Sequence, residues 1–265
     1  MSKKAHPALR IAAGLLLAIP FGLILWKAGG PTSRPQYPRW QAEEKNLAVA
    51  IDREAASADA RLVRLLLEEK LSGREFSFAT VAEACSGKKV IPLDERESHR
   101  RVKSAIESAL NRAIEKLSAT DSPVRSLRRI NEASRFFEEA LLESLDAEAD
   151  LSCGVPPNRR GESQQTGYPD LRVVHHPSGD VFYLDPKLVE DGSRDSSLRS
   201  FYFEPKDETL KITDDAVHLL AGIGHDGKDG AWTFTGFELV DLSGLKVRLK
   251  AEFQASNKDL YPGGR

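Results

Sequence analysis

Two acidic residues and one lysine lie in neighbouring strand-like segments and could form one chemical site. Asp170 directly precedes the apolar run 171–176, and Asp185 and Lys187 lie near the end of the next run, 181–188. The short segment between the runs contains Pro, Ser and Gly, which is typical of a tight turn between antiparallel strands. The pattern therefore predicts a β-hairpin that carries two carboxylates and one ammonium group.

The turn determines which residues of this hairpin face one another. A two-residue or four-residue turn centred on residues 178–179 places Arg172 opposite Asp185, and Asp170 opposite Lys187. Side chains alternate between the faces of a strand, so both acids and the lysine project from one face. Directly opposed residues lie about 5 Å apart. The three charged groups are therefore expected to converge.

This combination of groups suits a hard divalent cation and a phosphate ester. Mg²⁺ prefers oxygen ligands and is usually held by one or two carboxylates together with waters and substrate phosphates. A bound metal can activate water and stabilise charge on the phosphate. A nearby lysine can orient or deprotonate the attacking water, or stabilise the developing charge.

Pro169-Asp170 followed by Asp185-x-Lys187 resembles the motif of the PD-(D/E)xK nuclease superfamily, in particular its restriction-endonuclease-like domains. The resemblance covers roughly residues 125–255. It implies that Asp170 and Asp185 bind Mg²⁺ or Mn²⁺ and that Lys187 assists attack on a phosphodiester. It also implies a nucleic-acid substrate, with DNA expected, and a central mixed sheet flanked by helices.

Members of this superfamily often add a glutamate from the preceding helix, which here offers Glu138, Glu139 and Glu143. At about 100° per residue, Glu138 lies at the border of the apolar stripe of this helix, whereas the other two point towards solvent. We therefore expect Glu138 to be the third acidic site residue and metal ligand. A solvated surface glutamate is the alternative.

Pro186 departs from the superfamily pattern, which usually has an apolar residue at this position. Proline removes a hydrogen-bond donor from a strand that the fold places centrally. A nuclease fold without catalysis is therefore one alternative. Glu204-x-Lys206 is a rival motif, because it also ends an apolar run, but it lacks the hairpin that brings Asp170 into place.

The remaining periodicity predicts helices packed on a mostly central sheet, an α/β fold. Helices are expected at 41–71, 97–117 and 123–145, and strands at 171–176, 181–188, 198–203, 233–242 and 246–253. Residues 214–223 suit either a short helix or a buried strand, and 152–169 are expected to form a loop. We predict a helical region over 41–124 and an α/β nuclease-like domain over 125–265.

The N-terminal segment predicts a membrane anchor. Residues 11–26 are apolar and uncharged, although a bilayer-spanning helix needs about 20 residues. We expect residues 1–30 to form a single-pass anchor that meets the membrane through residues 9–26, or else a signal peptide, followed by a linker at 31–40. Charges on the two flanks are balanced, so the side of the membrane stays open.

Composition adds little to this prediction. The formal net charge of −2 gives no global signal for nucleic-acid binding. Cys85 and Cys153 could form one disulfide or remain two thiols, and His218 within an apolar run is expected to be a core residue. The sequence thus favours a membrane-tethered, Mg²⁺-dependent nuclease. A non-enzymatic membrane-anchored binding or envelope protein is the alternative outside the enzymes.

Overall fold

The computed structural model of the 265-residue chain describes residues 56–69, 71, 73–164, 166–193, 195–196, 201–227, 232–250 and 252–260. The predicted anchor, the linker and the first part of the helix expected at 41–71 lie outside these residues. Residues 56–68 are helical. Across the described ranges, no helix combines the length and the apolar character needed to cross a bilayer. The main compact unit begins at Ala60.

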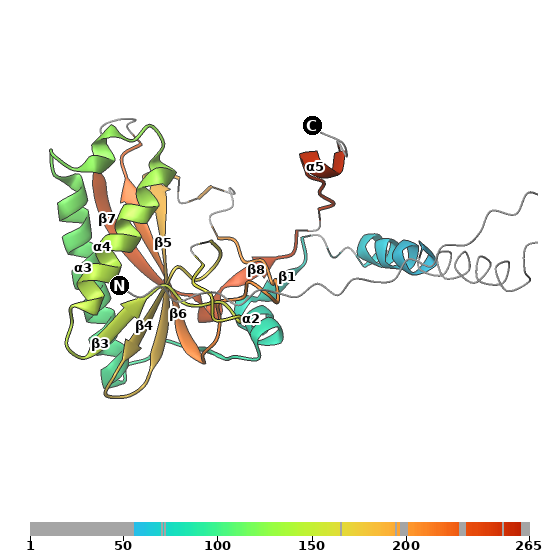
Figure 1. Cartoon of the computed structure of the whole chain (residues 1–265), viewed down its shortest axis with the longest axis horizontal. Coiled ribbons are helices and arrows are strands. Elements are labelled where there is room, and N and C mark those ends of the chain that lie inside the picture. Colours follow the sequence, from blue (N-terminus) through green and yellow to red (C-terminus); the bar gives the residue numbers. More distant parts are fainter. Residues whose placement is uncertain are drawn as a thin grey trace, which may run out of the picture. The chain divides into compact units, whose positions relative to one another are not determined.

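A six-stranded mixed sheet forms the centre of this unit (Figure 1). Its strands are β2 (Val90–Ile91), β3 (Leu151–Gly154), β4 (Leu171–His175), β5 (Val181–Glu190), β6 (Ala216–His225) and β7 (Phe234–Asp241). The path runs β2-β6-β5-β4-β3, and β7 also pairs with β6. β6 is parallel to β5 and β2, whereas the other pairs are antiparallel. The ambiguous segment 214–223 is therefore mostly a buried strand.

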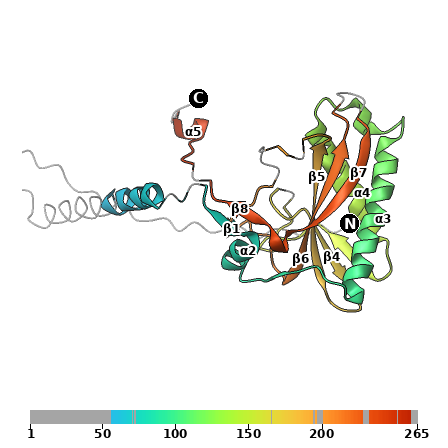
Figure 2. The ribbon, with the colours of Figure 1, turned by 180° about the vertical axis from the view of Figure 1, so that it is seen from behind.

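Helices α3 (Glu97–Ser118) and α4 (Ser134–Asp146) lie side by side on one face of the sheet (Figure 1), and α3 runs along β7 (Figure 2). The helix predicted at 97–117 is confirmed to within one residue. The apolar stripes of both helices are buried against the sheet in one core, which includes Ile106, Leu110, Phe137 and Leu141. This burial fixes the position of α4, the helix that carries Glu138.

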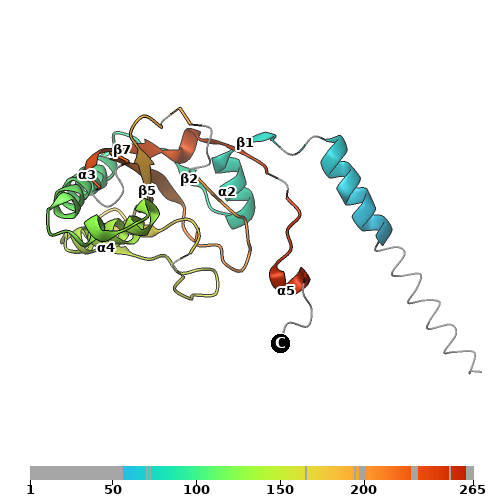
Figure 3. The same ribbon diagram turned by 90° about the horizontal axis from the view of Figure 1, so that it is seen from above.

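The opposite face of the sheet has a second core, under α2 (Phe78–Ser86) (Figure 3). Phe78, Tyr168 and Tyr183 belong to this core. Next to it, β1 (Glu75–Ser77) pairs with β8 (Lys246–Arg248), after the turn η3 (Leu242–Gly244), and a short helix, α5 (Asn257–Leu260), follows. Odd-numbered residues of β5 face this second core, which determines where Asp185 and Lys187 point.

The helix predicted at 123–145 is interrupted. Ser122 caps the 3₁₀ turn η1 (Pro123–Ser126), with Pro123 in its first turn, and η2 (Ile130–Ala133) precedes α4. Between them Leu127 is extended, and its carbonyl accepts a hydrogen bond from Trp232 Nε1 at 3.0 Å. A tertiary contact thus replaces a helical hydrogen bond.

Two other expectations are wrong. Residues 201–203, part of the strand predicted at 198–203, form no strand; instead Phe201 and Phe203 pack edge-on against Phe78. The loop predicted from residue 152 begins with strand β3, because Leu151 and Cys153 bury their side chains under α4. Cys153 and Cys85 are both free thiols.

Candidate active site

The β4–β5 hairpin has a register two residues away from the predicted one. Arg172 faces Tyr183, not Asp185, so the predicted pairing of Asp170 with Lys187 is also wrong. The turn lies one residue earlier in the chain than predicted: the His175 N–H donates to the Asp180 carbonyl at 2.9 Å, and the Gly179 N–H donates to the His175 carbonyl at 2.8 Å. Gly179 adopts a φ of +75°. This left-handed conformation is available to glycine at little cost. Because the shift is even, every side chain stays on its predicted face.

The hairpin brings the two predicted acids and the lysine together. Lys187 Nζ lies 2.7 Å from Asp185 Oδ2 and 3.1 Å from Asp170 Oδ2. Asp185 is 1% exposed, whereas a third of the Lys187 side chain is exposed, at 33%. Asp170 directly precedes β4, and Asp185 lies inside β5. The two acids therefore form the base of the cluster, and the amine reaches towards solvent.

Burial and like charge perturb the ionisation of this cluster. Desolvation, followed by the negative charge of Asp170, raises the pKa of Asp185 to about 7. Burial acts to lower the pKa of Lys187, but the charges of Asp185 and Asp170 outweigh it and raise that pKa. The cluster thus holds more buried negative charge than one ammonium group compensates, a pattern typical of catalytic carboxylate pairs.

Glu138 lies near these groups. Its side chain on α4 is half-buried, whereas Glu139 and Glu143 are exposed, as the helical geometry predicts. Burial and then the charge of Asp170 raise the pKa of Glu138, and the charge of Lys187 opposes this shift. Glu138 thus interacts electrostatically with the hairpin cluster.

The donor set fits a hard cation. Within the described part of the chain, no donor reaches the buried Asp185 Oδ2 with hydrogen-bond geometry, although Lys187 Nζ lies 2.7 Å away. Two carboxylates are enough for Mg²⁺, which retains waters. In the same residues, no three His, Cys, Asp or Glu side chains gather closely enough to hold a metal, so Glu138 does not close a three-carboxylate cage with Asp170 and Asp185.

Pro186 does not bend β5 out of the sheet. The strand continues to Glu190, and Pro186 pairs with Ala221 of β6. Pairing with β4 extends only to Leu184, so Pro186 lies where the β4-side edge of β5 has no strand partner, a position that tolerates proline. The rival motif is a surface ion pair, with Lys206 Nζ 2.9 Å from Glu204 Oε2.

A buried aromatic pair supports the segment that carries Asp170. His218 is a core residue, as predicted, and its Nδ1 lies 2.7 Å from the hydroxyl of Tyr168, with the rings stacked. Burial lowers the pKa of His218 to about 3, so the ring is neutral. The hydrogen bond fixes Tyr168 two residues before Asp170, although the sequence gives no signal that links this tyrosine to His218.

The sequence pattern also does not predict that a second lysine, Lys211, is buried near the acids. Lys211 lies between Leu210 and Ile212, a pattern that predicts a solvent-facing lysine on a half-buried strand. The structure buries all three residues, with Lys211 0% exposed. Burial lowers the pKa of its amine, and the charges of Asp170 and Asp185 oppose this shift.

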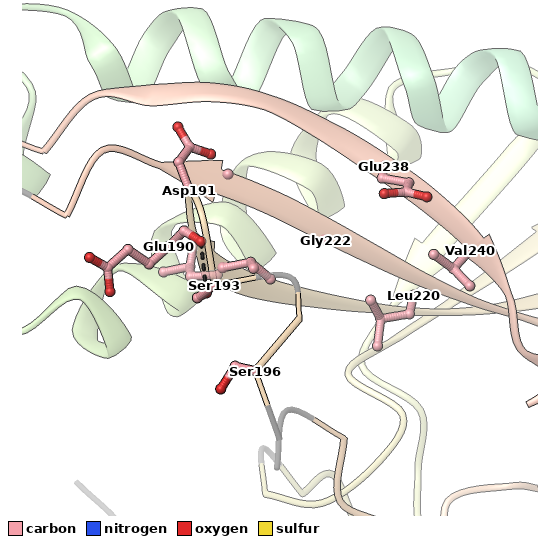
Figure 4. Close-up of a pocket in the computed structure, with 11 residues that line it drawn as sticks. Glu190, Asp191, Ser193, Ser196, Leu220, Gly222, Glu238 and Val240 are labelled. Atoms are coloured by element: carbon pink, nitrogen blue, oxygen red, sulfur yellow. Dashed lines mark hydrogen bonds between the residues drawn. The ribbon is translucent and has the colours of Figure 1, made fainter. Parts of the chain in front are cut away.

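A hollow of about 410 Å³ lies over β6 and β7 on the face of the sheet to which the cluster points (Figure 4). Its floor includes Leu220 and Gly222 of β6, which pair with Asp185 and Lys187 of β5. Leu220 and Val240 point away from the helical face in Figure 4. The absence of a side chain at Gly222 keeps this floor low at the residue that pairs with Lys187.

A mixed sheet flanked by helices, with a carboxylate pair and a lysine at the end of a central hairpin, defines a restriction-endonuclease-like nuclease, a hydrolase of phosphodiester bonds. Residues 71–264 match the sequence profile of the type II restriction enzyme MjaV family. The type II restriction enzyme MjaV of Methanocaldococcus jannaschii is 30% identical over 198 residues, which cover 71% of this chain and 85% of the relative. The chain therefore belongs to the type II restriction enzyme MjaV family.

Proposed function

We propose that this protein is a DNA endonuclease that uses Mg²⁺ or Mn²⁺ bound by Asp170 and Asp185, with Lys187 acting on the attacking water. The observation that carries the proposal is the convergence of the three groups, with the amine 2.7 and 3.1 Å from the two carboxylates. The restriction enzyme to which the chain is similar supports DNA as the substrate.

The division of roles follows from burial. The buried Asp185 and the mostly buried Asp170 offer oxygen ligands in a fixed position, and the metal would supply Lewis-acid activation of water and charge neutralisation. Lys187 is partly exposed, so its amine can reach a water or a phosphate oxygen at the mouth of the cluster. Glu138 would add a half-buried carboxylate that could hold the cation through a water or orient the attacking water.

The test is cleavage of plasmid DNA by the full-length chain, with Mg²⁺ or with a chelator, and with RNA as a parallel substrate. We expect Lys187→Met to lower the cleavage rate about 100-fold or more, because general acid–base groups contribute roughly that much. Lys206→Met is the matched control, since Lys206 occupies the same spacing in the exposed rival motif. Equal losses in both variants, cutting of RNA alone, or cleavage that survives chelation would refute the proposal.

We also propose that residues 9–26 hold the enzyme at a membrane, on the basis of the uncharged apolar stretch 11–26 within them. The full chain should sediment with membranes and stay there at high salt, and a chain lacking residues 1–30 should not. Release of the full chain by salt alone would contradict an embedded anchor.

A further inference from the structure

Lys211 is a fully buried lysine that the proposed mechanism does not use. Its side chain is 0% exposed, and its neighbours Leu210 and Ile212 pack in the core beside Tyr168 and Tyr183. Burial of an ammonium group is costly unless negative groups surround it. Burial lowers the pKa of Lys211, and the charges of Asp170, Asp185 and Glu138 oppose this shift.

One partner is the loop that leads to Asp170. Lys211 Nζ donates to the carbonyl oxygen of Gln164 at 3.3 Å, and the backbone N–H of Arg159 donates to the carbonyl of Leu210 at 3.0 Å. The adjacent residues Leu210 and Lys211 are thus hydrogen-bonded to this loop at Arg159 and Gln164. Lys211 is held in place by the chain that positions Asp170.

The segment after Lys211 is attached to the two strands of the hairpin. The Thr213 N–H donates to the Tyr183 hydroxyl at 2.9 Å, and Asp214 forms a bidentate ion pair with Arg172, with both distances 2.8 Å. Tyr183 lies two residues before Asp185, and Arg172 lies two residues after Asp170. The acids and Lys211 are therefore parts of one rigid arrangement.

The charges in this arrangement can be counted. Lys211 interacts electrostatically with Asp170, Asp185, Glu138 and Lys187. Three carboxylates and two amines give a net charge of −1 when all are ionised. One divalent cation brings the site to +1, which complements the single negative charge of a phosphodiester. Without Lys211 the same site would carry −2 and would attract cations more strongly.

We propose that Lys211 is a positioning residue that limits the negative charge of the active site, an inference that rests on the proposed metal site. With Lys211 in place, the active site takes one divalent cation and keeps a positive charge for the scissile phosphate. Lys211 acts through the carboxylates and does not touch the substrate. Its role is therefore separable from that of Lys187, which lies at the mouth of the cluster.

The experiment measures Mn²⁺ binding to the full-length protein without DNA, by electron paramagnetic resonance of free Mn²⁺ at mildly alkaline pH. Lys211→Gln keeps a donor towards the Gln164 carbonyl but removes the charge, and Lys211→Met removes both. A nearby charge typically changes an ionic equilibrium by one to three logarithmic units, so we expect Mn²⁺ to bind about tenfold more tightly or more to both variants. Lys211→Arg, which keeps the charge, should bind Mn²⁺ like the parent.

Two controls separate this role from a structural one. Arg159→Ala removes side-chain contacts of the same loop with Asp207 and the Cys85 carbonyl but leaves the buried amine, and its Mn²⁺ affinity should equal that of the parent. Asp185→Asn should abolish binding. Parent-like or weaker Mn²⁺ binding in folded Lys211→Gln or Lys211→Met overturns the inference about Lys211 alone. If the parent binds no Mn²⁺, the proposed metal site itself fails.

Discussion

Replacement of Asp185 by asparagine should stabilise the metal-free protein at alkaline pH while abolishing DNA cleavage. Asp185 is 1% exposed, and burial together with Asp170 raises its pKa from 3.8 to about 7. Ionised Asp185 is therefore unfavourable in the folded chain until a cation binds. Asparagine has nearly the same shape but no charge to neutralise.

The size and sign of the effect follow from proton linkage. Because the pKa is higher in the folded state, the folded chain binds more protons than the unfolded chain between the two pKa values. Its stability is therefore greatest at low pH and falls as the pH rises through about 7. One pKa unit corresponds to about 1.4 kcal/mol, so this group lowers the free energy of unfolding by up to about 2.5 kcal/mol between about pH 5 and about pH 8.

The assay is urea denaturation of the full-length protein in chelator, followed by tryptophan fluorescence at the two pH values. The stability advantage of Asp185→Asn over the parent should be larger at about pH 8 than at about pH 5, by about 1–2.5 kcal/mol. Asp121→Asn is the matched control, since this exposed loop carboxylate should leave the pH dependence unchanged. The reasoning is refuted if Asp185→Asn keeps the pH dependence of the parent.

Three further predictions concern the surroundings of the pair. Glu138→Gln should slow Mg²⁺-dependent cleavage about tenfold or more, as mutation of metal-supporting groups typically does, whereas Glu139→Gln, on the exposed neighbour, should cut like the parent in the same plasmid assay. Tyr168→Phe removes the partner of the buried His218 and should lower the free energy of unfolding in urea by about 1–3 kcal/mol; an unchanged urea midpoint would argue against the bond. Added Mg²⁺ should raise the melting temperature of the parent but not of Asp185→Asn, and equal shifts in calorimetry would exclude Asp185 as a ligand.

Alternation of side chains made the acid pair predictable from the sequence, even though the register was not. The chain closes the turn after β4 on residues 176–179, one residue earlier than expected, with Gly179 in the left-handed conformation. That choice moves the pairing by two residues and leaves Asp170, Asp185 and Lys187 on one face. The face of the sheet that a side chain occupies depends only on whether its position in the strand is odd or even. The pairing register depends on the geometry of the turn, which several sequences share.

Contacts between distant segments were not predictable. The pattern around Lys211 indicates an exposed lysine, and only the packing of Leu210 and Ile212 against the hairpin buries it. The interruption before α4 likewise depends on Trp232, more than 100 residues away, which takes the Leu127 carbonyl. Local periodicity carries no information about such partners, whereas the long, regular helix α3 was predicted almost to its ends.

The position of β6 has a consequence for how the protein becomes active during synthesis. β5 runs from Asp185 onwards beside β6 alone, and β6 also holds β2 and β7. A nascent or truncated chain that ends before residue 216 lacks the strand partner of the part of β5 that carries Asp185 and Lys187. Translation products that stop before β6 should therefore be inert towards DNA, and only chains that extend past β6 should cut it.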